Sequence, residues 1–309
     1  MTVETPASDA KVAIANQGRG LKPLEQSFVL IVGIARNCER TLERDLERLA
    51  AAFAAARQLA FLVVESDSSD GTVRLLQRLA LQQSRFAYQA LGVLADHLPQ
   101  RTARIAYCRN RYLQALSHEP GYRDVDLVVV ADLDGVNTLI SPSAVQSCWC
   151  HADWDVCTAN QKGPYYDIWA LRHPLWSPND CWKQVSFLSA QGLGRFRTLV
   201  TAVYGRMIRV SPSASWIEVD SAFGGLALYR RACLDRVSYE GIDATGSEVC
   251  EHVALHQQIR AAGGRILINP ALINAELVEH AAPATRRGLV RLFLSSWLKR
   301  WLQRTRRVL

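Results

Sequence analysis

The most informative stretch of the 309-residue chain is Leu127-Val128-Val129-Val130-Ala131-Asp132-Leu133-Asp134-Gly135. Its apolar run does not alternate with polar residues, which predicts a buried strand, central in a parallel sheet. Strand alternation would point Asp132 and Asp134 to the same side, with Leu133 turned into the core. Open α/β sheets bind ligands at the carboxyl ends of their strands. There the two carboxylates would repel each other unless a divalent cation or a ligand lay between them, although an ordinary Asp-Gly turn explains the pattern equally simply.

On both sides of this stretch the sequence predicts alternating strands and helices. We expect strands at residues 28–35, 61–64, 86–90, 156–160 and 265–268, and helices at 39–58, 72–82, 101–116, 141–150 and 247–262. The repeated order of strand and helix predicts a parallel sheet with right-handed crossovers and helices on both faces. The predicted fold class is therefore α/β, with a mixed and mostly parallel sheet.

Length and composition are consistent with one large α/β domain or two small ones. The sequence is 49% hydrophobic, but it contains no apolar run long enough for a membrane-spanning helix. Residues 1–26 lack the apolar core of a signal peptide, and we expect them to be a disordered lead-in. The eight cysteines form no C-x-x-C pair, which favours reduced thiols and a cytoplasmic protein.

The positive charge of the chain is concentrated at its C-terminal end. The net charge is +7, and eight Lys or Arg residues without a single Asp or Glu follow residue 285, so the rest is close to neutral. A charge confined to one tail argues against a nucleic-acid-binding domain. Residues 285–309 place Leu, Phe and Trp four apart beside these cations, the pattern of a helix lying on an anionic membrane surface. A helix packed on the protein body or on a partner protein is the alternative.

Residues 162–216 differ in composition and periodicity from the rest of the chain. Tryptophan and tyrosine residues alternate there with Pro, Gly and Asn, and the periodicity is weak, so we expect a loop-rich segment. Aromatic side chains dominate both cores and binding surfaces. The segment is therefore either an insertion with its own small core or a wall that stacks against sugar rings.

Several motifs, taken in their order along the chain, resemble those of GT-A glycosyltransferases. They are G-I-A-R-N at 33–37, S-D-S-S-D-G-T at 66–72, R-I-A-Y-C-R-N-R at 104–111, D-L-D at 132–134, Y-Y-D-I-W-A-L-R at 165–172, G-G-L-A-L-Y at 224–229 and the segment around Glu251. More narrowly, the sequence is similar to the fungal α-mannosyltransferases of capsule assembly and of the Golgi mannan polymerase, and to their bacterial relatives. The resemblance covers residues 27–280.

The resemblance implies a GT-A domain at 27–280, with a nucleotide-binding half at 27–137 and an acceptor half at 138–280, followed by a basic amphipathic helix at 281–309. It implies metal-dependent transfer of a sugar, with mannose from GDP-mannose favoured and its anomeric configuration retained. The acceptor would be a polysaccharide or a lipid-linked glycan of lipopolysaccharide, capsule or exopolysaccharide assembly. With the basic tail, this places the protein on the inner face of the cell membrane.

The resemblance also assigns roles at the matched positions. Asp132 and Asp134 would hold Mn²⁺ or Mg²⁺. The nucleotide and its phosphates would contact Ile34, Arg36, Asp67, Arg104, Arg109, Asn110 and Asp132. The acceptor would contact Tyr165, Tyr166, Asp167, Trp169, Arg172, Gly224 and Gly225. The catalytic candidates are Glu251, Asp220 and His252.

The sequence departs from the family pattern at two points. His252 follows Glu251 where a second acid is common, and no histidine stands at the late position that often binds the metal, which leaves the third metal ligand open. An inverting transferase that uses a UDP-sugar, with Glu251 as base, is the main alternative. A non-catalytic subunit of a polysaccharide-synthesis complex is another. A nucleotidyltransferase is disfavoured because no Gly-rich loop follows the first strand.

Overall fold

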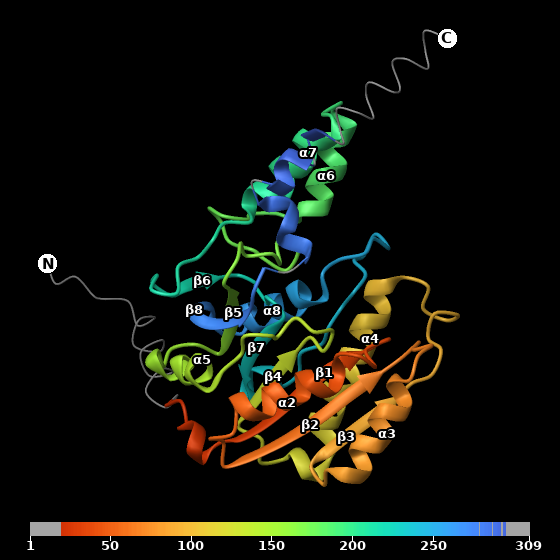
Figure 1. The fold of residues 1–309 in the computed structure, drawn as a ribbon, viewed down its shortest axis with the longest axis vertical. Coiled ribbons are helices and arrows are strands. Elements are labelled where there is room, and N and C mark those ends of the chain that lie inside the picture. Colours follow the sequence, from red (N-terminus) through yellow and green to blue (C-terminus); the bar gives the residue numbers. More distant parts are fainter. Residues whose placement is uncertain (1–19, 278, 286, 292, 295–309) are drawn as a thin grey trace, which may run out of the picture.

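The computed structural model describes residues 20–277, 279–285, 287–291 and 293–294. Its centre is an eight-stranded sheet with the strand order β3-β2-β1-β4-β7-β5-β8-β6 (Figure 1). The strands are β1 (Phe28–Ala35), β2 (Gln58–Glu65), β3 (Phe86–Ala90), β4 (Leu127–Ala131), β5 (Val156–Gln161), β6 (Ile217–Val219), β7 (Leu226–Arg230) and β8 (Ile266–Ala275). The expected central strand is β4, whose five residues are all buried.

The sheet is mixed. Strands β3, β2, β1 and β4 pair in parallel, and so do β5 and β8. Strand β7 is antiparallel to both of its neighbours, β4 and β5, and β6 is antiparallel to β8. The predicted α/β class with a mixed, mostly parallel sheet is confirmed.

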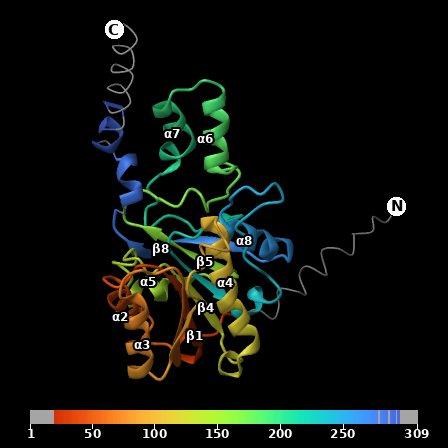
Figure 2. The same ribbon diagram turned by 90° about the vertical axis from the view of Figure 1, so that its right-hand side faces the viewer.

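Helices cover both faces of this sheet (Figure 2). The covering helices are α2 (Leu42–Ala52), α3 (Thr72–Gln82), α4 (Arg101–His118), α5 (Pro142–Gln146) and α8 (Glu251–Ala261). Two further helices, α6 (Cys181–Ala190) and α7 (Arg195–Ala202), do not lie on the sheet (Figure 1). Apolar side chains of α2, α3 and α5 share one buried cluster with Leu127 and Val129, whereas those of α4 and α8 share another with Val128 and Val130. Strand β4 contributes to both layers, and this explains why its sequence does not alternate.

The structure corrects several predicted elements. The helix expected at 39–58 is confined to Leu42–Ala52, and the strand expected at 265–268 continues to Ala275 as β8. The segment 162–216 contains two helices that were not predicted, α6 and α7, which project from the body in both views (Figures 1 and 2). Most of its other residues lie outside helices and strands, as expected for a loop-rich segment. All eight cysteines are free, as expected.

The two ends of the chain are described only in part. Leu24–Gln26 form a short 3-10 helix, and Leu24 is buried, so the described chain is already packed before residue 27. The helix expected at 281–309 lies largely outside the described residues: Glu279–Ala284 form a 3-10 helix, and positions 287–291 and 293–294 are helical. No helix in the described ranges has the length and apolar character needed to cross a membrane.

The loop after β4 is held by hydrogen bonds on both sides. The Asp132 N–H donates to the Gly225 carbonyl (3.0 Å), and the Asn137 side chain donates to the Asp132 carbonyl (2.7 Å). On the other side, the Gly135 N–H donates to the buried carboxylate of Asp45 from α2 (2.7 Å). Because its backbone is anchored at both ends, this loop can present Asp132 and Asp134 in a fixed arrangement.

Leu133 packs against a glycine. A Cβ atom at Gly33 in β1 would lie 2.6 Å from Leu133 Cδ1 and 2.8 Å from the Ala131 carbonyl oxygen. The missing side chain therefore lets Leu133 turn into the core between the two aspartates, as the alternation of the strand predicted.

We predict that Gly33→Ala destabilises the protein by about 1–3 kcal/mol, because the added methyl group must displace backbone as well as the Leu133 side chain. Urea unfolding measures the change. Gly121→Ala is the matched control, since no atom lies within 4 Å of the added Cβ there. Equal stability of the two variants would contradict the packing role of Gly33.

Candidate active site

A cavity of about 310 Å³ opens at the carboxyl ends of β1, β2 and β4. Residues following these strands form one side of it, and the first turns of α4 and α8 form the other. Most of the predicted site residues line it: Ile34, Arg36, Asp67, Arg104, Arg109, Asp132, Asp134, Tyr166, Asp167, Trp169, Glu251 and His252. Its volume is within the range of small-molecule sites.

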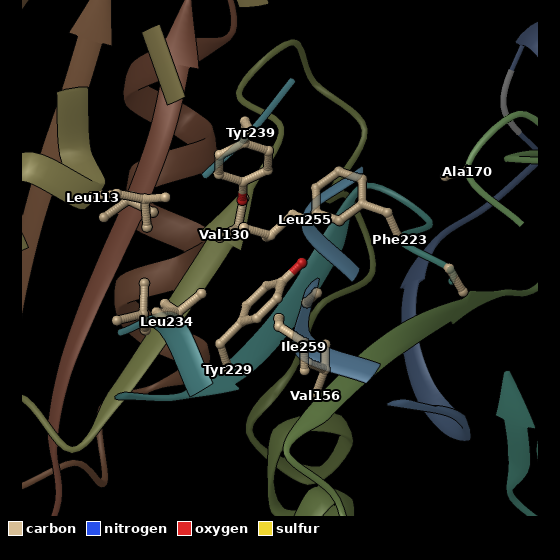
Figure 3. Close-up of a cluster of buried hydrophobic side chains, with 14 of the residues drawn as sticks. Leu113, Val130, Val156, Ala170, Phe223, Tyr229, Leu234, Tyr239, Leu255 and Ile259 are labelled. Carbon is tan, nitrogen blue, oxygen red and sulfur yellow. The ribbon is translucent and has the colours of Figure 1, made fainter. Parts of the chain in front are cut away.

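Arg109 forms the floor of the cavity. Its side chain is almost fully buried, and its Nε donates to Glu251 Oε1 (3.1 Å) while Nη2 donates to Asp132 Oδ1 (3.3 Å). The guanidinium carbon lies 5.4 Å from the ring centre of Phe223 and 5.7 Å from that of Tyr239. Figure 3 shows both rings among the buried hydrophobic side chains of the core. One cation thus joins α4, the end of β4 and the start of α8.

Negative charge accumulates around Asp132. Burial raises the pKa of Asp132 to about 7; Arg109 opposes this shift, whereas the carboxylates of Asp134, Asp167 and Glu251 reinforce it. Burial also raises the pKa of Asp167, although the amides of Gly224 and Ala170 hydrogen-bond to that carboxylate. A further cation near Asp132 would relieve this repulsion.

Asp134 differs from Asp132 in its surroundings. Its side chain is exposed, and it has no hydrogen bond or ion pair with any other residue that the structure describes. It also lines a second hollow of about 520 Å³, which shares Arg36, Cys38 and Asp134 with the first. Asp134 therefore stands at the junction of two hollows, with its carboxylate available to a ligand.

Arginines line the same cavity. Arg36 and Arg104 are held in place: Arg36 Nε donates to the Asp67 carbonyl (3.3 Å), and Arg104 Nη1 donates to the carbonyls of Leu98 (2.7 Å) and Pro99 (2.8 Å). Arg101, exposed in the first turn of α4, lines the cavity as well. Such a group of cations can bind an anionic ligand such as a diphosphate.

Asp67 holds the next loop. Its Oδ1 accepts from the N–H groups of Leu94 and Ala95, both at 2.9 Å, and its own backbone is in the left-handed region (φ 59°). Burial opposes the charged form, but these hydrogen bonds, one from Ser66 and the charge of Arg104 together lower the pKa of Asp67 below its usual value. The residue therefore shapes the cavity by fixing the segment that follows β3.

Two consecutive glycines allow Tyr166 and Asp167 to pack close to the end of β4. Gly224 and Gly225 have φ values of +71° and +83°, and a Cβ at Gly225 would lie 2.7 Å from the Tyr166 hydroxyl oxygen. The Gly224 N–H donates to Asp167 Oδ2 (3.0 Å). Only a residue without a side chain combines this backbone conformation with such a close approach.

His252 is a buried imidazole at the cavity wall. Its ring stacks on Phe223, with the ring centres 3.8 Å apart, and neither ring nitrogen has a hydrogen-bond partner among the described residues. Nε2 lies 3.7 Å from Glu251 Oε1. Burial, followed by the charge of Arg109, lowers the pKa of His252 well below its ordinary value, so the ring is neutral.

Six residues predicted to belong to the site do not line this cavity: Gly224 and Gly225, described above, and four that are held by contacts elsewhere. Asp220 is 59% exposed at its side chain and lies 3.6 Å from Arg260. Arg172 pairs with Asp180 (3.1 Å), Tyr165 packs its ring against Trp176, and the Asn110 side chain hydrogen-bonds to the backbone of Tyr239. These contacts support the walls of the site from outside.

Other cavity residues were not predicted: Ala35, Cys38, Ser66, Arg101, Ile105, Cys108, Leu133, Ala170, Phe223 and Cys250. Most of them adjoin predicted residues in the sequence, and Arg101 begins the arginine-rich helix that was already singled out. Phe223 carried no signal of its own, since an aromatic residue before two glycines does not indicate contact with an arginine.

The third metal ligand stays open. In the described part of the chain, no group of three or more His, Cys, Asp or Glu side chains is arranged to hold a metal ion. Asp132 and Asp134 line the cavity together with the carboxylates of Asp67, Asp167 and Glu251.

Neither family models nor curated proteins match the chain. Solved structures do. A mannosyltransferase from Pyrobaculum calidifontis in complex with GDP-Man and Mn²⁺ matches at 16% identity and a TM-score of 0.49, over 94% of this chain and 69% of that one. TarS 1–349 of S. aureus matches at 13% identity and a TM-score of 0.45, over 81% of this chain and 60% of that one. Glucosyl-3-phosphoglycerate synthase from Mycobacterium tuberculosis in complex with UDP matches at 14% identity and a TM-score of 0.37, over 96% and 86%.

Behind the cavity, α8 also buries His256. Its Nδ1 lies 2.9 Å from Ser221 Oγ and its Nε2 lies 2.8 Å from the Tyr229 hydroxyl. Burial lowers the pKa of His256 to about 3. Below pH 6.5 the unfolded chain binds a proton at this residue that the folded protein does not bind, so acid favours unfolding.

We predict that the free energy of unfolding falls by up to about 1.4 kcal/mol per pH unit between pH 6.5 and 3 through His256 alone. His256→Gln should flatten this dependence, as urea unfolding at pH 5 and pH 7 would show. His118→Gln, at an exposed position, should leave the slope unchanged. An unchanged slope in His256→Gln would disprove the assignment.

We predict that Arg109→Leu lowers the free energy of unfolding by about 3–5 kcal/mol, because it leaves Glu251 and Asp132 without their buried cation. Arg123→Leu, at an exposed arginine, should change it by less than about 0.5 kcal/mol. In the double variant Arg109→Leu/Glu251→Gln, part of the loss should be recovered, since one uncompensated charge is gone. Strict additivity of the two changes would show that the pair is not coupled.

Proposed function

We propose that this protein is a metal-dependent glycosyltransferase that binds a nucleotide sugar in the cavity after β4. The observation that carries the proposal is the pair Asp132 and Asp134: one carboxylate is exposed and has no partner among the described residues, the other is crowded by like charges, and Arg36, Arg101 and Arg104 line the same cavity. This arrangement can hold a divalent cation and a diphosphate side by side.

The residues present fit a hard divalent cation, Mn²⁺ or Mg²⁺. Asp134 has an unused carboxylate, and a cation beside it would offset the repulsion that raises the pKa of Asp132. Two carboxylates with phosphate and water as the remaining ligands suit such an ion. When bound, the ion would neutralise charge on the leaving diphosphate.

The arginines and the aromatic wall perform the remaining tasks. Arg36, Arg101 and Arg104 bind and orient the diphosphate, whereas Tyr166, Asp167 and Trp169 face the acceptor. Glu251 Oε1 already accepts a hydrogen bond from Arg109 (3.1 Å), so we infer that Glu251 orients the acceptor. This favours retention of configuration, in which the leaving phosphate itself takes the acceptor proton.

The donor favoured by the motifs is GDP-mannose, and the acceptor class is a lipid-linked glycan or a polysaccharide of the cell surface. The basic residues 285–309, which lie mostly outside the described part of the chain, would keep the protein on the anionic inner face of the membrane. Because these Lys and Arg residues are not balanced by Asp or Glu, the segment is attracted to anionic lipid headgroups.

One observation favours a second candidate, an inverting transferase that uses a UDP-sugar. Glu251 lines the cavity and could serve as the base of such a reaction if a bound acceptor displaced its hydrogen bond from Arg109. A non-catalytic subunit would keep the cavity but transfer no sugar.

We predict that GDP-mannose raises the melting temperature when Mn²⁺ is present and not in its absence. At a donor concentration of about 100 times Kd the gain in stability is about 2.7 kcal/mol. Asp134→Asn should abolish the gain while leaving the melting temperature without ligand unchanged. Asp124→Asn, an exposed aspartate before β4, is the matched control and should respond like the wild type.

The same measurement across GDP- and UDP-sugars separates the candidates. A response to UDP-sugars alone would favour the second candidate, and analysis of the product anomer would decide between retention and inversion. Donor binding by Asp134→Asn equal to that of the wild type would refute the metal assignment.

A further inference from the structure

The tip of the α6–α7 hairpin exposes apolar and cationic side chains together. We define the hairpin tip as Phe187 near the end of α6, Leu193 in the connection, and Arg195 and Arg197 at the start of α7. Phe187 is 62% exposed and Leu193 is 37% exposed. The hairpin projects from the body at the end of the molecule opposite to β3 and α3 (Figures 1 and 2).

The charge around this tip has one sign. Residues 181–217 contain five Lys or Arg and no Asp or Glu. Two of the five have partners, since Lys183 pairs with Asp243 (2.7 Å) and Arg206 hydrogen-bonds to Asn179 (2.7 Å). Arg195 and Arg197 are exposed and form no ion pair with any other described residue. A partner for this surface must therefore be anionic.

The last described helical residues extend the same surface. The ring of Phe293 contacts that of Phe196 in α7, with the ring centres 5.3 Å apart. Val290, Phe293 and Leu294 are 57%, 46% and 53% exposed. Arg287 and Arg291 are exposed beside them. Both views place this segment next to α7 (Figures 1 and 2).

We propose that the hairpin tip is a docking surface for an anionic lipid bilayer. Exposed Phe and Leu beside unpaired arginines is the composition of a surface that enters the headgroup region, where the apolar groups are buried and the cations meet lipid phosphates. A protein partner is less well matched, because the surface has no acid with which to pair a basic group of the partner.

The hairpin is connected directly to the cavity wall. Asp180 caps α6 through hydrogen bonds from the N–H groups of Trp182 (2.8 Å) and Lys183 (3.0 Å), and its other oxygen accepts from Nε1 of Trp169 (2.9 Å), which lines the cavity. The ten residues of α6 span about 15 Å. If the proposed function holds, docking would place the cavity at about that height above the bilayer, within reach of an acceptor carried on a lipid phosphate.

Vesicle flotation with the full chain tests the docking surface. The probes are vesicles of phosphatidylcholine alone and of phosphatidylcholine mixed with phosphatidylglycerol. The wild type should float with the anionic vesicles only, and less so at high salt. Phe187→Ser/Leu193→Ser and Arg195→Glu/Arg197→Glu should each weaken this binding by roughly tenfold or more.

Matched controls lie on α3 and next to it, at the far end of the molecule. Leu81→Ser removes an apolar side chain that is 90% exposed, and Arg74→Glu/Arg85→Glu changes the charge by the same amount as the hairpin variant does. Both should bind vesicles like the wild type. The melting temperature without ligand should be close to that of the wild type in all variants, which shows that they fold and keeps this test independent of the proposed function.

Three results would overturn the proposal. If the hairpin variants bound anionic vesicles as strongly as the wild type, the vesicle affinity would be assigned to residues 286–309 alone. Deletion of those residues would confirm that assignment. Failure of the wild type to bind anionic vesicles would exclude the bilayer. The wild type could instead fail to bind vesicles and self-associate in a concentration-dependent way, as light scattering would show. If Phe187→Ser/Leu193→Ser abolished that self-association, the surface would be assigned to a second copy of the chain.

Discussion

The candidate site depends on the burial of one guanidinium. Burying the charge of Arg109 without partners would carry a large desolvation penalty, but two carboxylates and two aromatic rings surround it. Because these partners come from the end of β4, from α8 and from the loops at Phe223 and Tyr239, the cation determines how those segments meet. Asp132 is thereby kept in place, and Asp134, two residues on, remains free at the cavity mouth.

The elements that the sequence predicted best are those whose pattern is local. Strands β1 and β3 and helix α3 have the predicted bounds, because uninterrupted apolar runs and polar caps mark them. The helices α6 and α7 were missed, since side chains such as Phe187 are apolar and yet exposed, which obscures the amphipathic period. The continuation of β8 beyond residue 268 was missed because Asn269-Pro270 interrupts the apolar run; the structure accommodates the interruption through register shifts against β5.

The order of the motifs correctly predicted which residues meet at the cavity where those residues lie on helices or strands or directly after them. Asp132, Arg109 and Glu251 converge as expected, although their mutual hydrogen bonds could not be inferred from spacing. Predictions for Arg172 and Asp220 did not hold for the cavity, because in loops the direction of a side chain depends on its tertiary partner, here Asp180 and Arg260. No local pattern encodes such a partner.

The carboxylate of Asp180 makes two kinds of contact: it caps the N-terminus of α6, and it accepts a hydrogen bond from the indole of Trp169. The chain therefore cannot shift the Trp169 indole by a change at Asp180 without also disturbing the first turn of the hairpin. The geometry of the cavity wall and the orientation of the hairpin are in this way mechanically coupled through a single side chain.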